Sequence, residues 1–555
     1  MASRLAETIR RRVSAEVGAV RKEHGGRLRV CLVYPNTYSV GMSSLGFQTI
    51  YHLLNADGGV VCERAFAPDK EDLADLERTQ SPLVSYESQT SLQEFDVVAF
   101  SVSYELDYVN VARVLRLGRV PVMAAERGGE HPLVLAGGAA VTINPEPLAE
   151  LVDGAVLGEA EEVLGEVVEA MREGQGGREA ALARLGEGEG VWVAGGNCGI
   201  LRSAQNDSKR EAGMGMPALQ DGNGRRACGD MRALQNGPAG VGTPALQRQR
   251  RYVGELDEWP THSRVLTRET EFGELFLVEV SRGCGRGCKF CVTPACYWPL
   301  RWRSVGSVLA SVREGLEHRK AIGLVGAAVS DHPAIDEIAR RIVGMGARLS
   351  VSSLRADSVS DVLIEALVRS GARSITIAPE AGSERLRDAI GKGITDAQII
   401  DALKRAAAAG MREAKLYFMV GLPGETEEDV AAIPELVRRC LKEAGLSRVT
   451  AGAGAFVPKP RTPFEREGML AVGELSGRLR AIREGLRREK RVRLAFESPN
   501  WSWVEGVLSR GDRRLGRVIA RVEELGGKLA AWRRALKEAG VSAEGYVGPG
   551  REVDG

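Results

Sequence analysis

Three of the nine cysteines in this 555-residue chain, Cys284, Cys288 and Cys291, stand in the spacing C-x3-C-x2-C. Three thiolates do not complete a tetrahedral zinc site, and no histidine lies nearby in the sequence to act as the fourth ligand. Three thiolates can instead hold three irons of a [4Fe–4S] cluster and leave the fourth iron open. The stretch therefore predicts an iron–sulfur site, and the alternative is a zinc loop or plain buried thiols.

The elements that must position these cysteines form a repeating strand–helix pattern. An apolar run at 276–280 leads directly into the cysteine loop, and helical stretches separate the strand candidates that follow. These candidates are 323–326, 349–352, 374–378, 415–420 and 449–452. Six β-α repeats predict a partial (β/α)6 TIM-like barrel over 253–465. Chemistry in β/α barrels collects at the carboxyl ends of the strands, where the cysteines and other polar motifs occur.

The cysteine spacing, with Phe290 directly before Cys291, resembles the radical S-adenosylmethionine (SAM) superfamily. In that superfamily the amine and carboxylate of SAM chelate the open iron, and the reduced cluster cleaves SAM to a radical. The resemblance implies that the three cysteines ligate the metal and that a reductant such as flavodoxin or ferredoxin supplies electrons. No side chain is assigned as a catalytic acid or base.

The same resemblance implies SAM contacts at successive strand ends. Asp331 stands near the place of a glutamate that often contacts the SAM amine, and Arg355 offers bidentate pairing to the SAM carboxylate. Glu380 is expected near the ribose or amine, and Gly421 on the adenine side. The full set of expected SAM contacts is Phe290, Gly326, Ala327, Ala328, Asp331, Ser353, Arg355, Glu380 and Gly421.

Residues 27–195 carry a second alternating pattern. Its strand candidates are 29–35, 59–61, 96–101, 132–136 and 155–157. Strands that alternate with helices predict an open parallel sheet, Rossmann-like and flavodoxin-like in strand order. Ligands of such sheets bind beyond the carboxyl ends of the strands, which is where the polar and glycine-rich stretches occur.

These strand-end stretches resemble a cobalamin-binding domain, whose signature is D-x-H-x-x-G, then S-x-L, then G-G. The chain has Asn36-x-Tyr38-x-x-Gly41, Ser101-x-Ser103 and Gly137-Gly138. The cobalt-ligating histidine is absent, and a tyrosine does not copy the bond of a neutral imidazole to cobalt. The resemblance implies the branch of cobalamin-binding-domain radical SAM proteins that lacks this histidine, with cobalamin contacts at these seven residues. The alternative is a Rossmann-like domain whose glycines serve only turns.

Three further segments complete the predicted organisation. Residues 1–26 form a helical leader. Residues 196–252 form a low-complexity insertion that buries too little apolar surface to fold, so we expect it to be disordered. Residues 466–555 form an arginine-rich helical region with Trp501 and Trp503. Basic residues interleaved with tryptophans indicate either an RNA-binding surface or a solvated helical face with packed tryptophans, and the balanced overall charge favours the second.

Composition limits the class of protein. The net charge of +1 gives no general attraction to DNA or membrane, and 44% hydrophobic residues suffice for large cores. The N-terminal residues contain no signal sequence, and no apolar run reaches membrane-spanning length. We therefore expect a cytoplasmic protein, where a reducing environment suits a thiolate metal site.

Together these features predict a radical SAM enzyme. The expected reaction is cobalamin-assisted methyl transfer to an unreactive carbon. An RNA- or tRNA-modifying enzyme without bound cobalamin is the alternative within enzymes. A non-catalytic cobalamin or redox sensor is the alternative from another class.

Overall fold

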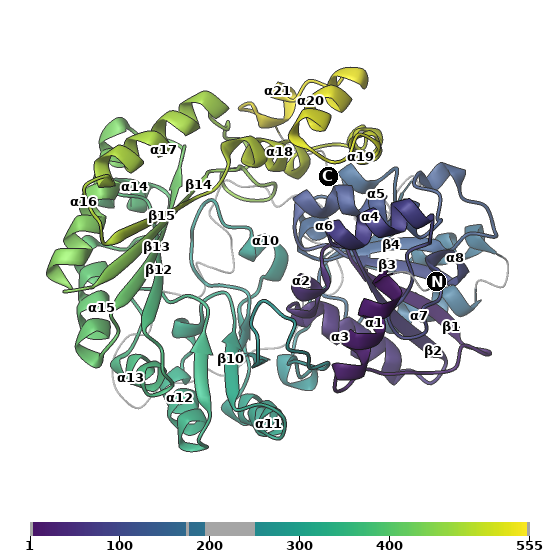
Figure 1. Ribbon diagram of the computed structural model, residues 1–555, viewed down its shortest axis with the longest axis horizontal. Coiled ribbons are helices and arrows are strands. Elements are labelled where there is room, and N and C mark those ends of the chain that lie inside the picture. The colour runs from purple at the N-terminus through teal and green to yellow at the C-terminus, as the bar shows by residue number, and fades with distance from the viewer. Residues whose placement is uncertain (1–3, 174–176, 195–249, 552–555) are drawn as a thin grey trace, which may run out of the picture.

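The computed structural model describes residues 4–173, 177–194 and 250–551. An N-terminal α/β unit and a partial β/α barrel lie side by side, and the C-terminal helices lie along one end of both (Figure 1). The insertion predicted at 196–252 falls almost wholly outside the described residues. Within the described ranges, no helix is long and apolar enough to cross a membrane.

The N-terminal unit is built on a six-stranded sheet of order β2-β1-β3-β4-β5-β6. Its strands are β1 (Leu28–Tyr34), β2 (Val60–Phe66), β3 (Val97–Ser101), β4 (Leu133–Gly137), β5 (Gly154–Val156) and β6 (Val191–Val193). The first five are parallel, so the predicted flavodoxin-like order is confirmed. The sequence analysis missed β6, an antiparallel edge strand beside β5, because three residues are too short to show a period.

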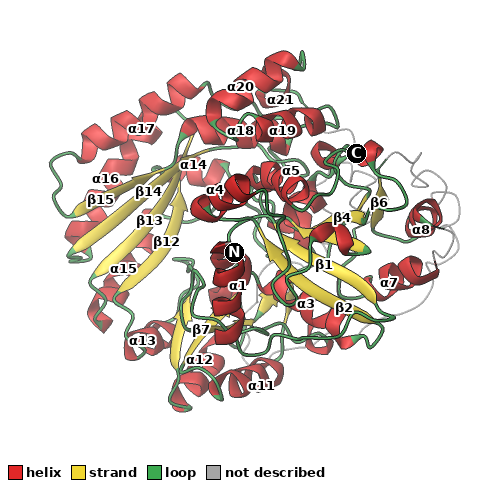
Figure 2. Ribbon diagram, turned by 45° about the vertical axis from the view of Figure 1, so that its right-hand side comes forward, coloured by secondary structure: helices red, strands yellow, loops and turns green. Residues whose placement is uncertain are grey.

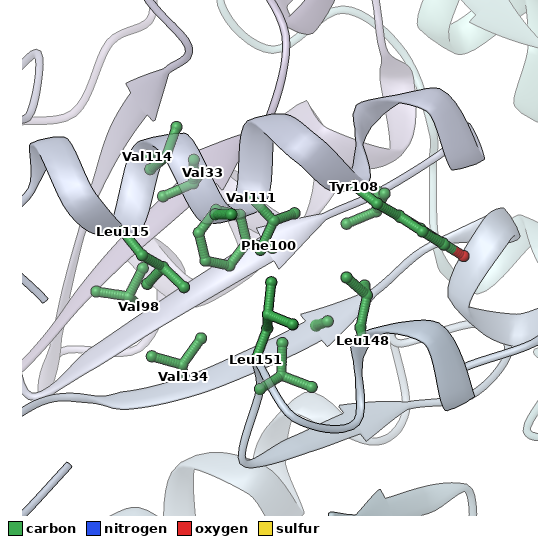
Figure 3. Packing of buried hydrophobic residues seen from close by; sticks show 14 of the residues in the cluster. Val33, Val98, Phe100, Tyr108, Val111, Val114, Leu115, Val134, Leu148 and Leu151 are labelled. Carbon is green, nitrogen blue, oxygen red and sulfur yellow. The ribbon is translucent and has the colours of Figure 1, made fainter. Parts of the chain in front are cut away.

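Helices cover both faces of this sheet. They are α2 (Tyr38–Met42), α3 (Leu45–Ala56), α4 (Lys70–Thr79), α5 (Tyr108–Leu117), α6 (Ala139–Ile143), α7 (Leu164–Glu173) and α8 (Arg178–Leu185). On one face, Val98 and Phe100 of β3 pack closely against Val111 and Leu115 of α5 (Figure 3). The other face is covered less tightly, and its cavity is described with the site.

The leader is shorter than predicted. Helix α1 (Arg4–Ala15) ends well before residue 26, and Gly18 has a φ of +93°, which does not continue a right-handed helix. Glu16 instead forms a buried ion pair with Arg64 at 2.6 Å. The residues after α1 therefore pack onto the sheet unit as extended chain.

The barrel consists of a three-stranded and a four-stranded parallel sheet, of orders β11-β10-β7 and β12-β13-β14-β15. The strands are β7 (Leu275–Glu279), β10 (Ala321–Val325), β11 (Arg348–Val351), β12 (Ser374–Glu380), β13 (Glu413–Val420), β14 (Arg448–Ala455) and β15 (Val492–Phe496). A parallel bridge between Leu354 and Ile377 joins the two sheets. The six predicted strands are confirmed.

The barrel helices lie outside these strands, as Figure 2 shows for α15, α16 and α17 beside β12–β15. They are α11 (Val305–Leu316), α12 (Ile335–Gly344), α13 (Asp361–Arg369), α14 (Glu384–Ala389), α15 (Asp396–Ala409), α16 (Glu427–Glu443) and α17 (Val472–Leu486). The predicted helical region over 466–555 is wrong at 492–496, where the chain forms β15. The side chains of its sequence VRLAF alternate between partly buried and exposed, which suits a strand at the sheet edge.

The C-terminal helices fold back onto the N-terminal unit. They are α18 (Pro499–Ser509), α19 (Leu515–Glu524), α20 (Leu529–Glu538) and α21 (Glu544–Val547). Helix α19 packs against α5, and Val518 and Trp532 belong to the same apolar core as the first sheet. Trp532 is fully buried and Trp503 is partly buried against this core, whereas Trp501 is 38% exposed. Most of the apolar surface of these helices is therefore used for packing.

A buried ion network joins the N-terminal unit to the barrel. Arg282 lies 2.9 Å from Glu159, 2.8 Å from Glu161 and 3.0 Å from Glu279. Burial alone would raise the pKa of Glu159, but Arg301 and Arg282 lower it below its ordinary value. The glutamates after β5 thus serve the domain interface.

We predict that Arg282→Met lowers the thermal stability of the protein strongly. Three buried carboxylates lose a shared cation, and removal of one partner from a buried pair costs about 3–5 kcal/mol. The thermal unfolding midpoint of the apoprotein measures this effect. The control is Arg313→Met on the exposed side of α11, and equal midpoints for the two variants would contradict the prediction.

Candidate functional site

The cysteine loop begins directly after β7. Residues Ser281–Arg282 form the short strand β8, which pairs with β9 (Arg301–Trp302). Gly283 then turns with a φ of +85°, and a Cβ there would lie 2.4 Å from the carbonyl oxygen of Tyr297. Only glycine fits this turn, which leads the chain to Cys284.

The three cysteines are half-buried free thiols. Burial raises the pKa of Cys284 and of Cys288, and the neighbouring Cys291 raises both further. The three thiols are therefore within electrostatic reach of one another. Lys392 lowers the pKa of Cys288, and Arg355 acts on both thiols in the same direction. Such cations favour the thiolate form that binds metal.

This thiol set fits an iron–sulfur cluster better than zinc. Among the described residues, no three His, Cys, Asp or Glu side chains are grouped closely enough for one metal ion. A single zinc needs four ligands at close range, whereas a cuboidal cluster holds its thiolates farther apart. The ligand assignment stays a prediction, and Cys284, Cys288 and Cys291 would be the residues that hold the cluster.

An arginine inside the cysteine motif anchors the loop to the barrel. Arg286 forms a bidentate pair with Asp331 at 2.8 and 2.9 Å and reaches Asp357 at 3.2 Å. Asp357 also accepts a hydrogen bond from Arg355 at 2.9 Å. The structure thus places Asp331 and Arg355 near the cysteine loop and engages both in protein ion pairs, and their contacts with SAM stay predictions. A SAM amine or carboxylate would share these groups with Arg286 and Asp357.

Glu380 sits at an irregular end of β12. The pairing of β12 with β13 shifts register between Ile377 and Glu380, and Glu380 has a φ of +71°. Burial raises the pKa of Glu380, and the Lys392 ammonium at 3.1 Å lowers it. A non-glycine residue held at positive φ is strained, and such strain is concentrated at functional sites. The contact of Glu380 with SAM stays a prediction.

The other expected SAM contacts occupy varied surroundings. Gly326 and Ala327 line a cavity between the two units, and Ala328 is buried beside them. Ser353 is exposed just after β11. Gly421 has a φ of +84°, and its N–H donates to Glu425 at 2.7 Å. Phe290 packs with Phe464 and Phe456 in a small apolar cluster beneath the loop. Their contacts with SAM stay predictions.

His332 and Cys296 are packed residues. His332 is buried, and its Nε2 lies 3.0 Å from the carbonyl oxygen of Arg303. Cys296 is buried in α10 (Thr293–Tyr297), which lies between the barrel and the N-terminal unit (Figure 1). Its Sγ lies 3.7 Å from the carbonyl oxygen of Ala139.

The loop after β14 closes the barrel mouth, and the sequence analysis did not identify its contacts. Lys459 lies 2.6 Å from Glu105 of the N-terminal unit and 2.8 Å from Glu505 of α18. The N–H of Phe464 donates to the carbonyl oxygen of Lys289, inside the cysteine motif, at 3.2 Å. One loop therefore joins the cysteine loop, the first sheet unit and the C-terminal helices.

A cavity of about 450 Å³ lies along the face of the first sheet opposite α5. Its floor is formed by alternate residues of the strands, including Val30, Ala99 and Leu135. Helices α3 and α7 form its walls, and Gly137 and Gly138 lie at the carboxyl edge. Gly138 has a φ of +108°, and a Cβ there would lie 2.5 Å from the carbonyl oxygen of Val102. We call this cavity the sheet slot.

The sheet slot brings together only part of the expected cobalamin set. Ser101, Gly137 and Gly138 line it, and Ser103 is exposed at the same sheet edge. Tyr38 is buried, stacks on Tyr86 with ring centroids 5.2 Å apart, and donates to Glu16.

The two outer residues of the first motif also serve packing. Asn36 donates to Asp107 at 2.8 Å, and a Cβ on Gly41 would meet Phe66 at 2.5 Å. The residues of the first motif therefore already pack and form hydrogen bonds within the protein, and their contact with cobalamin stays a prediction.

Comparisons with known proteins agree with this architecture. The family model of the N-terminal region of radical SAM proteins matches residues 46–194, and the radical SAM superfamily model matches residues 278–437. The chain belongs to the radical SAM superfamily and is a radical SAM enzyme. The cofactors of this superfamily are a [4Fe–4S] cluster and SAM.

Individual relatives cover different shares of the chain. An uncharacterized protein of Methanocaldococcus jannaschii, MJ0966, is 27% identical over 88% of this chain and 90% of its own length. A tRNA-2-methylthio-N(6)-dimethylallyladenosine synthase of Chromohalobacter salexigens is 28% identical over 36% of this chain and 46% of its length.

One solved structure covers nearly the whole chain. The radical SAM methyltransferase TsrM of Kitasatospora setae, with cobalamin and a [4Fe–4S] cluster bound, has a TM-score of 0.55. It is 15% identical and covers 92% of this chain and 99% of its own. This likeness confirms the fold: a Rossmann-type unit followed by a partial barrel and C-terminal helices.

We predict that Arg286→Gln weakens cluster retention without unfolding the barrel. The loop loses its pairs with Asp331 and Asp357, and loss of such outer-shell partners costs about 10- to 100-fold in metal affinity. Iron and sulfide content after anaerobic reconstitution, followed by the rate of loss to a chelator, measures this effect. Arg340→Gln, exposed on α12, is the control; equal loss rates in the two variants would rule out an anchoring role.

We predict a pH effect from Asp107. Burial raises its pKa to about 7, although hydrogen bonds from Asn36 and Asn110 oppose the shift. The folded pKa lies above the unfolded value, so the stabilisation is complete below pH ~4 and is lost as the pH rises through 7. Asp107→Asn keeps the acceptor without the charge. Between pH 5 and pH 8 the wild type should lose on the order of 2–4 kcal/mol more free energy of unfolding than Asp107→Asn. The thermal midpoint of the wild type should therefore fall further than that of the variant. Parallel curves for wild type and variant would contradict this assignment.

Proposed function

We propose that this radical SAM enzyme is cobalamin-dependent and transfers a methyl group to an unreactive carbon. The observation that carries the cobalamin part is the sheet slot. It runs along the sheet face from Leu28 to the carboxyl edge at Gly138 and lies between α3 and α7. Ligands of parallel sheets enter at that edge.

The chemistry of the slot suits the nucleotide tail of a corrinoid. Its lining is mainly aliphatic, which fits a flat heteroaromatic base. Two hydroxyls on its wall, Thr49 Oγ1 and Ser281 Oγ, are buried and have no hydrogen-bond partner among the described residues. Buried polar groups are nearly always paired, so these hydroxyls support a polar ligand here. The glycines at the mouth let the ligand approach the backbone closely.

The slot also lies next to the proposed SAM pocket. Gly326 and Ala327, at the end of β10, line it together with Ser281 and Gly283 of the cysteine loop. A corrin ring above the sheet edge would therefore face the barrel mouth. This neighbourhood supports methyl transfer, because the methyl donor and the site of SAM cleavage must both reach one substrate.

The residues of this chain would divide the work as follows. The three cysteines would hold the cluster, which supplies reductive cleavage of SAM when bound. Arg286 keeps the loop against Asp331, and the Glu380–Lys392 pair presents a polar surface toward Cys288. Phe290, Phe456 and Phe464 exclude water beneath the loop. A dry site suits radical chemistry, because it limits side reactions.

An RNA-modifying role is the second candidate. It is favoured by the likeness to the tRNA-2-methylthio-N(6)-dimethylallyladenosine synthase, which covers 36% of this chain. The C-terminal helices add little support, because Trp532 and the apolar faces of α18–α20 pack into the first core. Their arginines are also largely paired; Arg521, for example, lies 2.8 Å from Glu538.

The decisive experiment narrows the sheet slot with a larger side chain. We predict that Ala99→Leu, in the middle of β3, reduces cobalamin retention about 10-fold or more, because the added carbons occupy space that the tail requires. Retention of cobinamide, which lacks the nucleotide tail, should not change. The visible spectrum of desalted protein measures both, and formation of 5′-deoxyadenosine from SAM by dithionite-reduced protein reports the radical site separately.

Two results decide between the candidates. Wild-type protein that retains neither cobalamin nor cobinamide would contradict the cobalamin proposal. Copurified RNA in that same protein would favour the RNA-modifying role. Cys288→Ala is the matched control for SAM cleavage and should form no 5′-deoxyadenosine.

A further inference from the structure

Two cations of the loop after β14 have opposite surroundings. Lys459 is paired with both Glu105 and Glu505. Arg461, two residues later, forms no side-chain hydrogen bond or ion pair with any residue that the structure describes, and its Nη1 is buried. One loop thus carries an ammonium with two ion pairs and a guanidinium that has no side-chain ion pair among the described residues, although the Glu465 carboxylate acts on it electrostatically.

The backbone conformation and the burial of Arg461 are both energetically unfavourable. Its backbone has a φ of +60°, in the left-handed region, and its N–H donates to Glu465 at 2.5 Å. Burial lowers the pKa of Arg461 to about 10, and the neighbouring Arg250 opposes its charge as well. A buried guanidinium normally has hydrogen-bonded partners. Strained backbone that holds an unpaired charge points to a ligand.

A second guanidinium, Arg250, stands nearby without a direct ion pair among the described residues, although Glu159 acts on it electrostatically. Arg250 donates to the carbonyl oxygen of Cys296 at 2.6 Å and to that of Trp298, and forms no ion pair among the described residues. Arg250 and Arg461 both act electrostatically on Cys296, between the cysteine loop and the first sheet unit. Both guanidinium groups therefore lie in the same region and offer N–H donors there without a direct carboxylate partner among the described residues.

This charge lies close to the proposed radical site. Phe464, three residues after Arg461, is hydrogen-bonded to Lys289 between two of the cysteines. Neither Arg461 nor Arg250 lines the sheet slot, so their ligand is distinct from a group held inside it. A ligand at Arg461 would be positioned at the barrel mouth, where a substrate enters.

We infer that Arg461 binds an anionic group of the substrate, a carboxylate or a phosphate, and that Arg250 strengthens the local positive field. The planar guanidinium offers paired N–H donors, which match either group bidentately. This inference rests on the proposed radical site, and it names the class of substrate: an acid or a phosphorylated compound. The phosphodiester of the corrinoid is the other source of such a group, and the experiment separates the two.

The test uses inorganic phosphate as the probe. The proteins are wild type, Arg461→Gln and the control Arg488→Gln, which changes an exposed arginine after α17. Each carries the reconstituted cluster, cobalamin and SAM, and its thermal midpoint is measured in phosphate against chloride at equal ionic strength. Wild type and Arg488→Gln should be stabilised by phosphate, and Arg461→Gln should show at least ~10-fold weaker apparent affinity. Iron content and far-ultraviolet circular dichroism establish that the variant is folded.

Two outcomes overturn the inference. Equal phosphate stabilisation of wild type and Arg461→Gln means that Arg461 is not the binding group. Loss of cobalamin but not cobinamide from Arg461→Gln assigns the anion to the corrinoid tail. Both are distinct from failure of the proposed function, which shows as wild-type protein that retains no corrinoid.

Discussion

The structure depends on the ion network between Glu159, Glu161 and Arg282. Arg282 stands two residues before Cys284, and Glu159 follows β5 of the first sheet. The pair therefore links the start of the cysteine loop to the carboxyl edge of the other unit. A buried pair of this kind is weak evidence for net stability, but it fixes geometry, because alternative placements leave charges unpaired. Here it fixes the orientation of the cysteine loop relative to the carboxyl edge of the first sheet.

Ion pairs also join the units on the other side of the interface. Lys459 joins Glu105 of the first unit and Glu505 of α18, while Arg286 joins the cysteine loop to Asp331 and Asp357. These contacts surround the barrel mouth. The site is thus framed by charged groups that are paired within the protein, and Arg461 differs from them because its side chain has no hydrogen bond or ion pair among the described residues.

Much of the fold could be predicted from the sequence, because buried parallel strands are continuous apolar runs between helical stretches. The strands that were not predicted lacked that signal: β8 and β9 are two residues long, β6 is three residues long, and β15 carries Arg493 and lies at an edge. These segments are strands because a neighbouring strand pairs with them through hydrogen bonds.

Spacing along the chain supports a prediction for Cys284, Cys288 and Cys291, and their role as cluster ligands stays a prediction. Contacts that form only in three dimensions were not predictable, such as the pairing of Arg286 with Asp331 on the next barrel strand. Tyr38 shows the converse. Its place in the motif matched a ligand-binding pattern, yet its ring packs into the core against Tyr86. A position in a motif does not determine where a side chain points.

The return of the C-terminal helices to the first unit has a consequence for biosynthesis. Val504, Val518 and Trp532 complete the apolar core that β1 and β3 begin. During synthesis the chain emerges from its N-terminus, so this core stays incomplete while the whole barrel is made. The barrel core, whose last buried member is Leu486, is complete earlier along the chain than the core of the first unit, which includes Tyr546.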